Sequence, residues 1–433
     1  MNLVQITPGA GGMYCGNCFR DNALVGELRR QGHHVVMVPL YLPMTLDEAD
    51  QSAGTPVFFG GISVYLEQEF RWFRAAPRWL RQLLASPALL KLASGRAAKT
   101  RAADLGELTL SMLRGESGNQ VRELEELLAW LKTQPKPDAV CLSNALLLGM
   151  ARRIRSELGT RVICMLQGED GFLDALPQPH RDHCWQELST RAREVDGLIA
   201  PSRYFGDLMA GRMGLPTDRV SVVYNGIGLA GYGSGGAPRA GSGGGAPVVG
   251  FFARMCPEKG LDLLVEAFLL ARRSVPALRL KVGGSCGPGD EAFVARCRGR
   301  LQQAGAAEAA EFHPNLDREA KIRFLESLTL FSVPATYSEA FGLYLLEALA
   351  AGVPVVQPRR CAFPELVERT GGGIVCEPTV EALARGIVEL ASDPDRAARL
   401  GRTGRGVVAR EFSVEEMGRR MAATVAAIGP NGQ

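Results

Sequence analysis

Two carboxylates, Glu339 and Glu347, stand eight residues apart in an otherwise uncharged run of the chain, residues 337–356. Eight residues of helix span about 12 Å, which suits the two ends of one long ligand. We expect Glu339 to contact a sugar and Glu347 a ribose diol, with a pyrophosphate between them. The alternative is a solvated pair on an ordinary helix. It is disfavoured because Glu347 stands among apolar residues, where an unpaired carboxylate is costly.

The same run has the pattern of a helix that begins just after a strand. A strand ending near Pro334 leads into a turn, and Gly352 ends the helix that follows. The first amides of this helix, at Phe341, Gly342 and Leu343, have no intrahelical acceptors and favour an anion such as a diphosphate. Gly342 also lets a ligand approach the main chain closely.

Two basic side chains, Arg254 and Lys259, follow an apolar strand predicted over 248–253. They stand in the loop between that strand and a helix, where open α/β sheets bind their ligands. Either residue alone would most often be a solvated surface charge. Together with Glu339 and Glu347, they predict a site where two cations contact one pyrophosphate and stabilise a departing nucleotide.

Short β-rich apolar runs alternate with helical patterns along the chain, which is typical of parallel sheets built from βαβ units. The predicted strands of the first half are 3–6, 35–40, 139–142, 162–166, 198–200 and 220–224, and those of the second half are 248–253, 278–282, 311–313, 330–334, 354–357 and 373–376. The sequence therefore predicts an α/β fold with two doubly wound parallel sheets of similar size.

A segment rich in Gly, Ser, Ala and Pro, residues 228–247, separates the two halves. This composition favours a flexible chain that cannot build a core. We interpret the segment as an interdomain linker, because the strand and helix alternation restarts directly after it. A surface insertion within one domain is the alternative.

The composition is that of a globular protein, with 433 residues, 46% of them hydrophobic, and a net charge of +3. This even balance excludes a protein that works by coating nucleic acid. No run of 18 apolar residues occurs, the first residues lack the pattern of a signal peptide, and the ten cysteines are scattered. We therefore expect a cytoplasmic protein with reduced thiols.

The segment 67–101 interleaves aromatic and aliphatic residues with Arg and Lys. At helical spacing it would present a basic, aromatic face. Such a helix most often packs on its own domain. The alternative is peripheral contact with an anionic membrane on its inner face, or with a polyanionic acceptor.

With these motifs, the sequence resembles glycosyltransferase family 4, whose retaining GT-B enzymes transfer a sugar from a nucleotide diphosphate donor. The landmarks are Glu339 to Glu347 (E-x7-E), Arg254 and Lys259 (R-x4-K), Gly32-His33, Asn225-Gly226-Ile227 and the stretch 351–356. The resemblance implies two Rossmann-like domains facing a cleft, and catalysis without a metal or other cofactor. The expected parts are an acceptor-side domain 1–227, the linker 228–247, a nucleotide-sugar domain 248–412, and a C-terminal helix within 413–433 that packs back on the first domain.

The resemblance also implies roles for individual residues. It implies a catalytic group of Glu339, Arg254 and Lys259, and donor contacts from Glu347, Phe341, Gly342, Leu343, Asn225 and the pair Gly11-Gly12. The implied partners are a nucleotide sugar and a glycan, lipid or small-molecule acceptor.

The first half departs from the family pattern at two places. Many relatives have a His after the fourth strand, where this chain has Gln167, which can donate hydrogen bonds but does not titrate. Glu169 and Asp170 are then the local carboxylates. Gln167, Glu169 and Asp170 are weak candidates for the site, and for each carboxylate a helix cap or a surface acid is the alternative. Gly228 stands where relatives often have Asp.

Cys15 and Cys18 have the spacing of half a zinc site or of a redox dithiol. His180, His183 and Cys184 follow the fourth strand and could complete a metal site in the same crevice. We interpret the two cysteines as ordinary thiols beside a helix, and keep the metal site as the alternative.

The leading hypothesis is a hexose transfer from a UDP-, GDP- or ADP-sugar. The stretch 39–43 and the helical first half also resemble starch and glycogen synthases, which gives a glucosyltransferase as the second hypothesis. A sugar-nucleotide-binding protein without transferase activity is the third, because the family His is absent, and an epimerase is less favoured.

Overall fold

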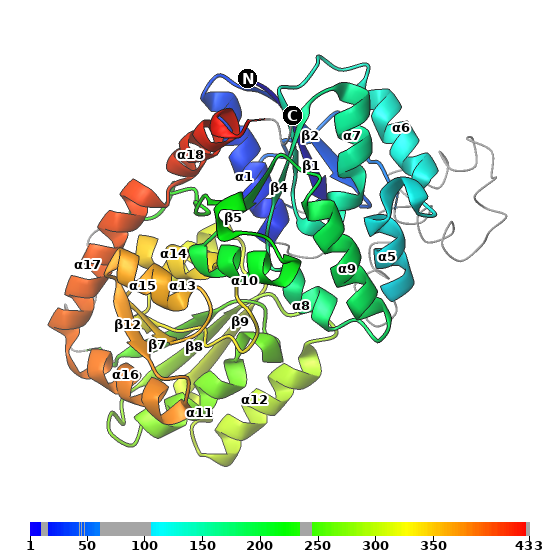
Figure 1. Ribbon diagram of the computed structural model, residues 1–433. Helices are drawn as coiled ribbons and strands as arrows, with labels where there is room; N and C mark the ends of the chain where they lie inside the picture. Colours follow the sequence, from blue (N-terminus) through cyan, green and yellow to red (C-terminus); the bar gives the residue numbers. More distant parts are fainter. Residues whose placement is uncertain are drawn as a thin grey trace. The chain divides into compact units, whose positions relative to one another are not determined.

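The computed structural model describes residues 1–9, 16–42, 44, 46, 48–60, 105–233 and 245–429 (Figure 1). The chain forms two units. The first contains Met1–Tyr224 and Met417–Gln433, and the second contains Asn225–Glu416. The boundary lies three residues before the expected end of the first domain. The described residues 228–233 of the Gly-rich segment are grouped with the second unit.

The first unit is built on a six-stranded sheet in the order β2-β1-β3-β4-β5-β6, in which every pair is parallel. Its strands are β1 Asn2–Pro8, β2 His34–Leu40, β3 Ala139–Leu142, β4 Arg161–Met165, β5 Gly197–Ala200 and β6 Val220–Val222. Its helices are α1 Gly16–Arg30, α5 Gly106–Leu113, α6 Val121–Leu131, α7 Ala151–Leu158, α8 Glu169–Asp174, α9 His180–Ala192 and α10 Arg203–Met213, with 3₁₀ helices η3 Gly115–Ser117, η4 Ala145–Met150 and η5 Thr217–Arg219.

The second unit is built on another six-stranded parallel sheet, in the order β12-β11-β10-β7-β8-β9. Its strands are β7 Val248–Phe252, β8 Arg279–Gly284, β9 Ala310–Pro314, β10 Leu330–Phe331, β11 Val355–Pro358 and β12 Gly373–Cys376. Its helices are α11 Leu261–Ala271, α12 Glu291–Gln303, α13 Arg318–Glu326, α14 Leu343–Ala350, α15 Phe363–Thr370, α16 Val380–Ser392 and α17 Pro394–Glu411, with 3₁₀ helices η6 Pro257–Lys259 and η7 Ala307–Ala309. Helix α18, Val414–Ala427, begins in the second unit and continues in the first.

The order of the second sheet reverses direction between β7 and β10. From β7 the chain proceeds outward through β8 and β9, and it then returns to the other side of β7 with β10. Open α/β sheets bind ligands at such a reversal, just beyond the carboxyl ends of the strands. Two loops, one after β7 and one after β10, therefore define the place where a ligand is expected.

The central strands are buried on both faces. Every residue of β3, β5 and β11 is buried, as expected for parallel strands covered by helices on either side. Local signals then delimit the helices. At α10, for example, the Ser202 hydroxyl accepts the amide of Phe205 at the start, and Gly214 ends the helix with a φ of 60°. The prediction of two doubly wound parallel sheets is confirmed.

The strand bounds differ from the prediction mainly at two places. Strand β6 ends at Val222 instead of at residue 224, and β10 contains only Leu330 and Phe331 instead of 330–334. After Phe331 the chain leaves the ladder, so the residues up to Glu339 form an irregular loop at the carboxyl edge of the sheet. In the part of the chain that the structure describes, no helix is long and apolar enough to cross a membrane.

Candidate functional site

The two loops at the reversal point of the second sheet are held close together. Gly260 follows the 3₁₀ helix η6 with a φ of 72°, and a Cβ there would lie 2.1 Å from the carbonyl oxygen of Pro334. The amide of Thr336 donates to the carbonyl of Glu258 at 2.9 Å. The loop after β7, which carries Lys259, is therefore fixed against the loop after β10, which carries Glu339.

Lys259 and Glu339 meet in a compact hydrogen-bonded cluster. The Nζ of Lys259 donates to Oε2 of Glu339 at 2.6 Å and to the hydroxyl of Tyr337 at 2.5 Å. The hydroxyls of Tyr337 and Tyr344 donate to the same Oε2 at 2.9 Å and 2.8 Å. The ammonium also lies 4.7 Å and 5.1 Å from the centres of these two rings, within cation–π range. One carboxylate oxygen therefore accepts three charge-assisted or phenolic hydrogen bonds.

The surroundings fix the protonation states of this cluster. Burial acts to raise the pKa of Glu339, but the positive charge of Lys259 and the hydrogen bonds outweigh it, so the pKa lies below its ordinary value. Burial, and then the charge of Glu339, raise the pKa of the Tyr337 hydroxyl, and the same two causes raise the pKa of Tyr344. The site therefore holds an ionised carboxylate and two phenols that remain hydrogen-bond donors at neutral pH.

Helix α14 begins later than the sequence predicts. Gly342 precedes it with a φ of 91°, a conformation that favours glycine, and Leu343 is its first residue. The amides of Leu343 and Tyr344 are therefore the ones without intrahelical acceptors, since Leu345 already donates to Gly342. Phe341 was expected to offer a helix amide, but it lies before the helix, and its buried ring packs 6.3 Å from that of Phe412.

Arg254 contacts a carboxylate that the sequence analysis did not single out. Its Nε and one terminal nitrogen donate to the two oxygens of Asp290 at 3.1 Å and 3.0 Å. The hydrogen bond that Arg254 donates to Asp290 raises the pKa of the guanidinium. The Asp290 side chain is 8% exposed and the Arg254 side chain is 61% exposed. This bidentate pair therefore fixes the plane of a guanidinium that still reaches solvent.

Glu347 lies on α14, about one turn after its start at Leu343, and it pairs with Lys321 of α13. The Nζ of Lys321 donates to Oε1 of Glu347 at 2.8 Å, and both side chains are largely covered. The structure thus brings Lys259 and Glu339 together directly, whereas Arg254 and Glu347 pair with Asp290 and Lys321.

The remaining predicted donor contacts are Asn225 and the pair Gly11-Gly12. Asn225 is buried in the second unit. Close to it along the chain, the Ile227 amide donates to the Phe412 carbonyl, and the Val414 amide donates back to Ile227. Gly11 and Gly12, and Cys15 with them, lie outside the described residues.

The three weak candidates lie after β4 of the first unit. Glu169 is buried, and its two oxygens accept the amides of Ala145 at 2.7 Å and of Gln167 at 2.9 Å. Burial, the largest cause, raises the pKa of Glu169 despite these bonds. Its carboxylate therefore ties the loop after β4 to η4, which is the capping alternative. Asp170 is also buried, and the side chain of Gln167 is half-buried.

The described cysteines and histidines form no metal cluster. Cys18 is buried and its Sγ donates to the carbonyl of Pro8 at 3.2 Å, while Cys184 lies 4.0 Å from the carbonyl of Gly106. Over the described ranges, no group of three His, Cys, Asp or Glu side chains could hold a metal ion.

Sequence reasoning missed four side chains of the second unit: Tyr337, Tyr344, Asp290 and Lys321. The two tyrosines carried a signal, because a phenol in an apolar run needs a polar partner once it is buried. Tyr344 stands in such a run, five residues after Glu339. Asp290 and Lys321 carried no comparable signal, since each belongs to a different βα unit from its partner.

Comparison with solved structures identifies the class of fold. Sucrose-phosphate synthase from Thermosynechococcus elongatus superposes with a TM-score of 0.72 at 19% identity, and the match covers 98% of each chain. Anabaena HepE in complex with UDP and glucose superposes with a TM-score of 0.65 at 16% identity over 99% of this chain. The two parallel sheets and these neighbours define a GT-B fold.

Sequence comparison identifies the family. The model of glycosyl transferases group 1 matches residues 238–407, and the model of glycosyltransferase family 4 matches residues 92–230. The chain belongs to glycosyltransferase family 4.

Curated relatives include a GDP-mannose-dependent monoacylated alpha-(1-6)-phosphatidylinositol monomannoside mannosyltransferase of Corynebacterium glutamicum, 30% identical over 183 residues. That match covers 40% of this chain and 46% of the relative. A D-inositol 3-phosphate glycosyltransferase of Nocardia farcinica is 32% identical over 216 residues, which is 48% of each chain. The matches therefore span about half the length of these relatives.

Proposed function

We propose that the protein transfers a hexose from a nucleotide diphosphate sugar to an acceptor, with retention of the anomeric configuration. The observation that carries the proposal is the cluster of Lys259 and Glu339 at the reversal point of the second sheet. It combines a cation suited to a diphosphate with a carboxylate suited to sugar hydroxyls, at the place where open α/β sheets bind nucleotides. Membership of family 4 supports the same reaction.

The diphosphate binds to Lys259, to the guanidinium of Arg254, and to the amides of Leu343 and Tyr344 at the start of α14. Glu347 accepts hydrogen bonds from the ribose hydroxyls, and Glu339 accepts them from the sugar. Glu339 already accepts three hydrogen bonds at one oxygen, so the sugar competes with the tyrosines or uses the other oxygen. Asp290 keeps Arg254 oriented in this account, and Lys321 does the same for Glu347.

In the reaction, the bond between the anomeric carbon and the diphosphate oxygen breaks, and the acceptor oxygen bonds to the same face of the sugar. The acceptor proton passes to the departing diphosphate oxygen. Lys259 and Arg254 stabilise the negative charge that develops there, and this electrostatic term supplies most of the catalysis. Because these cations are side chains, we expect the transfer to need no metal.

A GDP-hexose is the first donor to test, because the C. glutamicum relative is named as GDP-mannose-dependent. UDP- and ADP-sugars are the alternatives. The names of the relatives suggest an inositol-containing lipid or an inositol phosphate as the acceptor class. We place the reaction in the cytoplasm, with the acceptor at the inner membrane face if it is a lipid.

The test is a transfer assay with GDP-mannose, UDP-glucose and ADP-glucose, without metal, against inositol lipids in vesicles, soluble polyol phosphates and a glucan. Nuclear magnetic resonance of the product assigns its anomeric configuration. We expect one donor to give a product with the donor's anomeric configuration. The Lys259→Met variant should lose this transfer activity. An inverted product would overturn the retaining mechanism. Stabilisation by a donor without transfer would favour a non-catalytic binding protein, and transfer only from ADP- or UDP-glucose to a glucan would favour the synthase alternative.

A further inference from the structure

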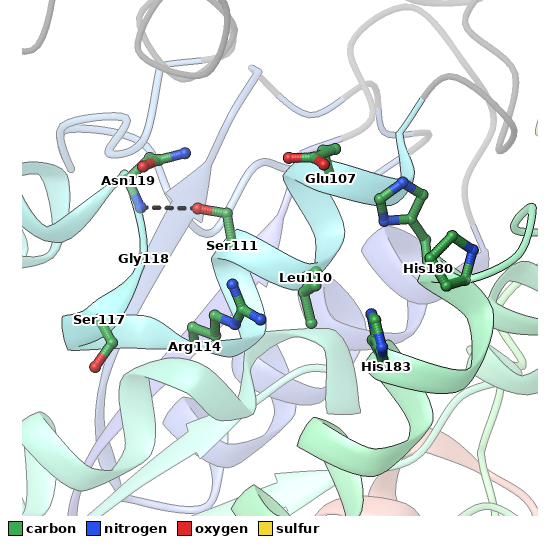
Figure 2. A pocket seen from close by; sticks show the side chains of 10 residues that line it. Glu107, Leu110, Ser111, Arg114, Ser117, Gly118, Asn119, His180 and His183 are labelled. Carbon is green, nitrogen blue, oxygen red and sulfur yellow. Dashed lines mark hydrogen bonds between the residues drawn. The ribbon is translucent and has the colours of Figure 1, made fainter. Parts of the chain in front are cut away.

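A polar pocket of about 300 Å³ lies in the first unit, and none of the residues assigned above to the donor lines it (Figure 2). It is formed by α5, by the chain at and after η3, and by the start of α9. Its polar lining includes Glu107, Ser111, Arg114, Ser117, Asn119 and His180. The volume is at the lower end of the range for small-molecule sites.

One face of α5 sets the polarity of the pocket. Glu107, Leu110, Ser111 and Arg114 follow each other at intervals of three, one and three residues, so they share one side of the helix. Glu107 and Arg114 are two turns apart, which is about 10 Å along the axis. Figure 2 shows Glu107 beside His180, and Arg114 toward the Ser117 end. The pocket therefore has a cationic end and a carboxylate end.

Close backbone contacts build the walls. A Cβ at Gly106 would lie 2.7 Å from the ring of His180, and a Cβ at Gly118 would lie 2.0 Å from the carbonyl oxygen of Ser111. The amide of Asn119 donates to the Ser111 hydroxyl at 2.8 Å. The imidazole of His180, the turn after η3 and the face of α5 are thus held at fixed positions around the pocket.

Arg114 has a fixed main chain and an available side chain. Its carbonyl accepts a 2.7 Å hydrogen bond from Arg191, whose side chain is 5% exposed and also pairs with Glu187. The nearby Glu116 pairs with Arg152 at 2.7 Å, so its charge is already neutralised. In the described part of the chain, the guanidinium of Arg114 has no hydrogen-bond or ion-pair partner.

His180 adds a second unmet group. Its Nδ1 is buried and has no hydrogen-bond partner among the described residues. The imidazole of His180 therefore forms part of the pocket wall, and its buried Nδ1 is out of reach of a ligand in the pocket.

We propose that this pocket is a binding site for a polyol phosphate. The guanidinium of Arg114 binds the phosphate in bidentate fashion, with hydrogen bonds from the Ser117 and Asn119 side chains. Glu107 accepts hydrogen bonds from the hydroxyls about two helical turns away, beside His180. The single carboxylate at the far end selects a ligand with hydroxyls there over one with a second anionic group. The site uses none of the residues assigned above to the donor, so its binding can be tested without a nucleotide sugar.

The test measures binding of glucose 6-phosphate, glycerol 3-phosphate, inorganic phosphate and uncharged glucose to the full chain by isothermal titration calorimetry. We expect a sugar phosphate to bind more tightly than inorganic phosphate, and glucose not to bind. Loss of the bidentate contact in Arg114→Gln should weaken sugar phosphate binding roughly tenfold. Co-sedimentation with phosphatidylglycerol vesicles forms a second arm, which distinguishes a lipid headgroup from a soluble phosphate as the source of the ligand.

Arg181→Gln is the matched control. Arg181 lies on α9 between His180 and His183, is exposed, pairs with Asp182, and does not line the pocket. The substitution Arg181→Gln removes the same charge as Arg114→Gln and should leave the binding of sugar phosphate unchanged. Equal losses in both variants would reduce the effect to net charge and overturn the proposal, as would the absence of binding to the wild type. Thermal unfolding at the same temperature in the wild type, Arg114→Gln and Arg181→Gln excludes misfolding. Glu107→Gln provides a further variant, in which the binding of sugar phosphate should weaken but the binding of inorganic phosphate should not.

Discussion

The Nζ of Lys259 lies 2.6 Å from Oε2 of Glu339, although the two residues are 80 positions apart in the chain. They come from the loops after β7 and β10, the two strands at which the order of the second sheet reverses. The amine proposed to bind the diphosphate and the carboxylate proposed to bind the sugar are therefore one ion pair. A substitution of either residue therefore removes the counter-ion of the other and the hydrogen bond that positions it.

Removal of the lysine charge should destabilise the fold. In Lys259→Met, the buried carboxylate of Glu339 keeps two phenols but loses its counter-ion, which should cost roughly 3 kcal/mol of unfolding free energy. Urea denaturation measures this. Lys281→Met is the control, because its amine donates only to Ser327 at an exposed position and should change stability by less than about 0.5 kcal/mol. Equal effects of the two substitutions would show that the ion pair does not stabilise the second unit.

The contribution of Glu339 should depend on pH with a definite sign. The pKa of Glu339 is lower in the folded protein than the ordinary value of 4.5. The ionised carboxylate therefore stabilises the fold above pH 4.5, and this stability is lost as the pH falls through the folded pKa. The difference in unfolding free energy between the wild type and Glu339→Gln should be greatest near neutral pH and should shrink below about pH 4.5. A difference that grows on acidification would contradict the assignment.

Tyr344→Phe removes a single hydroxyl from the cluster without changing its shape. The phenol donates to Glu339 at 2.8 Å, so its loss should cost about 1 kcal/mol of stability. It should also raise the pKa of Glu339, because one hydrogen bond to the ionised form is gone. The acid limb of donor binding should then move to higher pH. The limb should stay in place in Tyr204→Phe, whose phenol lies on α10 of the other unit.

Gly260 should be intolerant of any side chain. A Cβ there meets the carbonyl oxygen of Pro334 at 2.1 Å, and the φ of 72° is itself unfavourable for other residues. Gly260→Ala should cost roughly 3 kcal/mol and weaken donor binding, because it separates the two loops that carry Lys259 and Glu339. Gly305→Ala measures the cost of the left-handed backbone conformation alone, since Gly305 has a φ of 66° and nothing lies within 4 Å of the added Cβ. It should cost about 1 kcal/mol and leave donor binding unchanged.

Much of the fold follows from local patterns in the sequence. All the predicted strands occur, and the central ones follow from the sequence because a buried parallel strand is a short apolar segment. The E-x7-E spacing and the R-x4-K spacing likewise identified residues that follow the two strands at the reversal point. Strand positions and motif spacings depend on residues that are close together in the chain, so a single sequence is enough to predict them.

The partners of the site residues do not follow from the sequence in the same way. Asp290 pairs with Arg254 across 36 residues, and Lys321 pairs with Glu347 across 26. Such pairs depend on the order of strands in the sheet, which the apolar pattern leaves open. The start of α14 was also misplaced, because the left-handed conformation of Gly342 excludes Phe341 from the helix.

The most direct test of the central claim is calorimetric titration of GDP-mannose, UDP-glucose and ADP-glucose into the wild type and Glu347→Gln, without metal. Glu319→Gln serves as the control, since Glu319 lies on α13 with its side chain 86% exposed. The account predicts that one nucleotide sugar binds the wild type and Glu319→Gln equally, and binds Glu347→Gln roughly tenfold more weakly because the ribose contacts are lost. Undiminished affinity in Glu347→Gln, or no binding of any nucleotide sugar to the wild type, would contradict a donor site at the carboxyl edge of the second sheet.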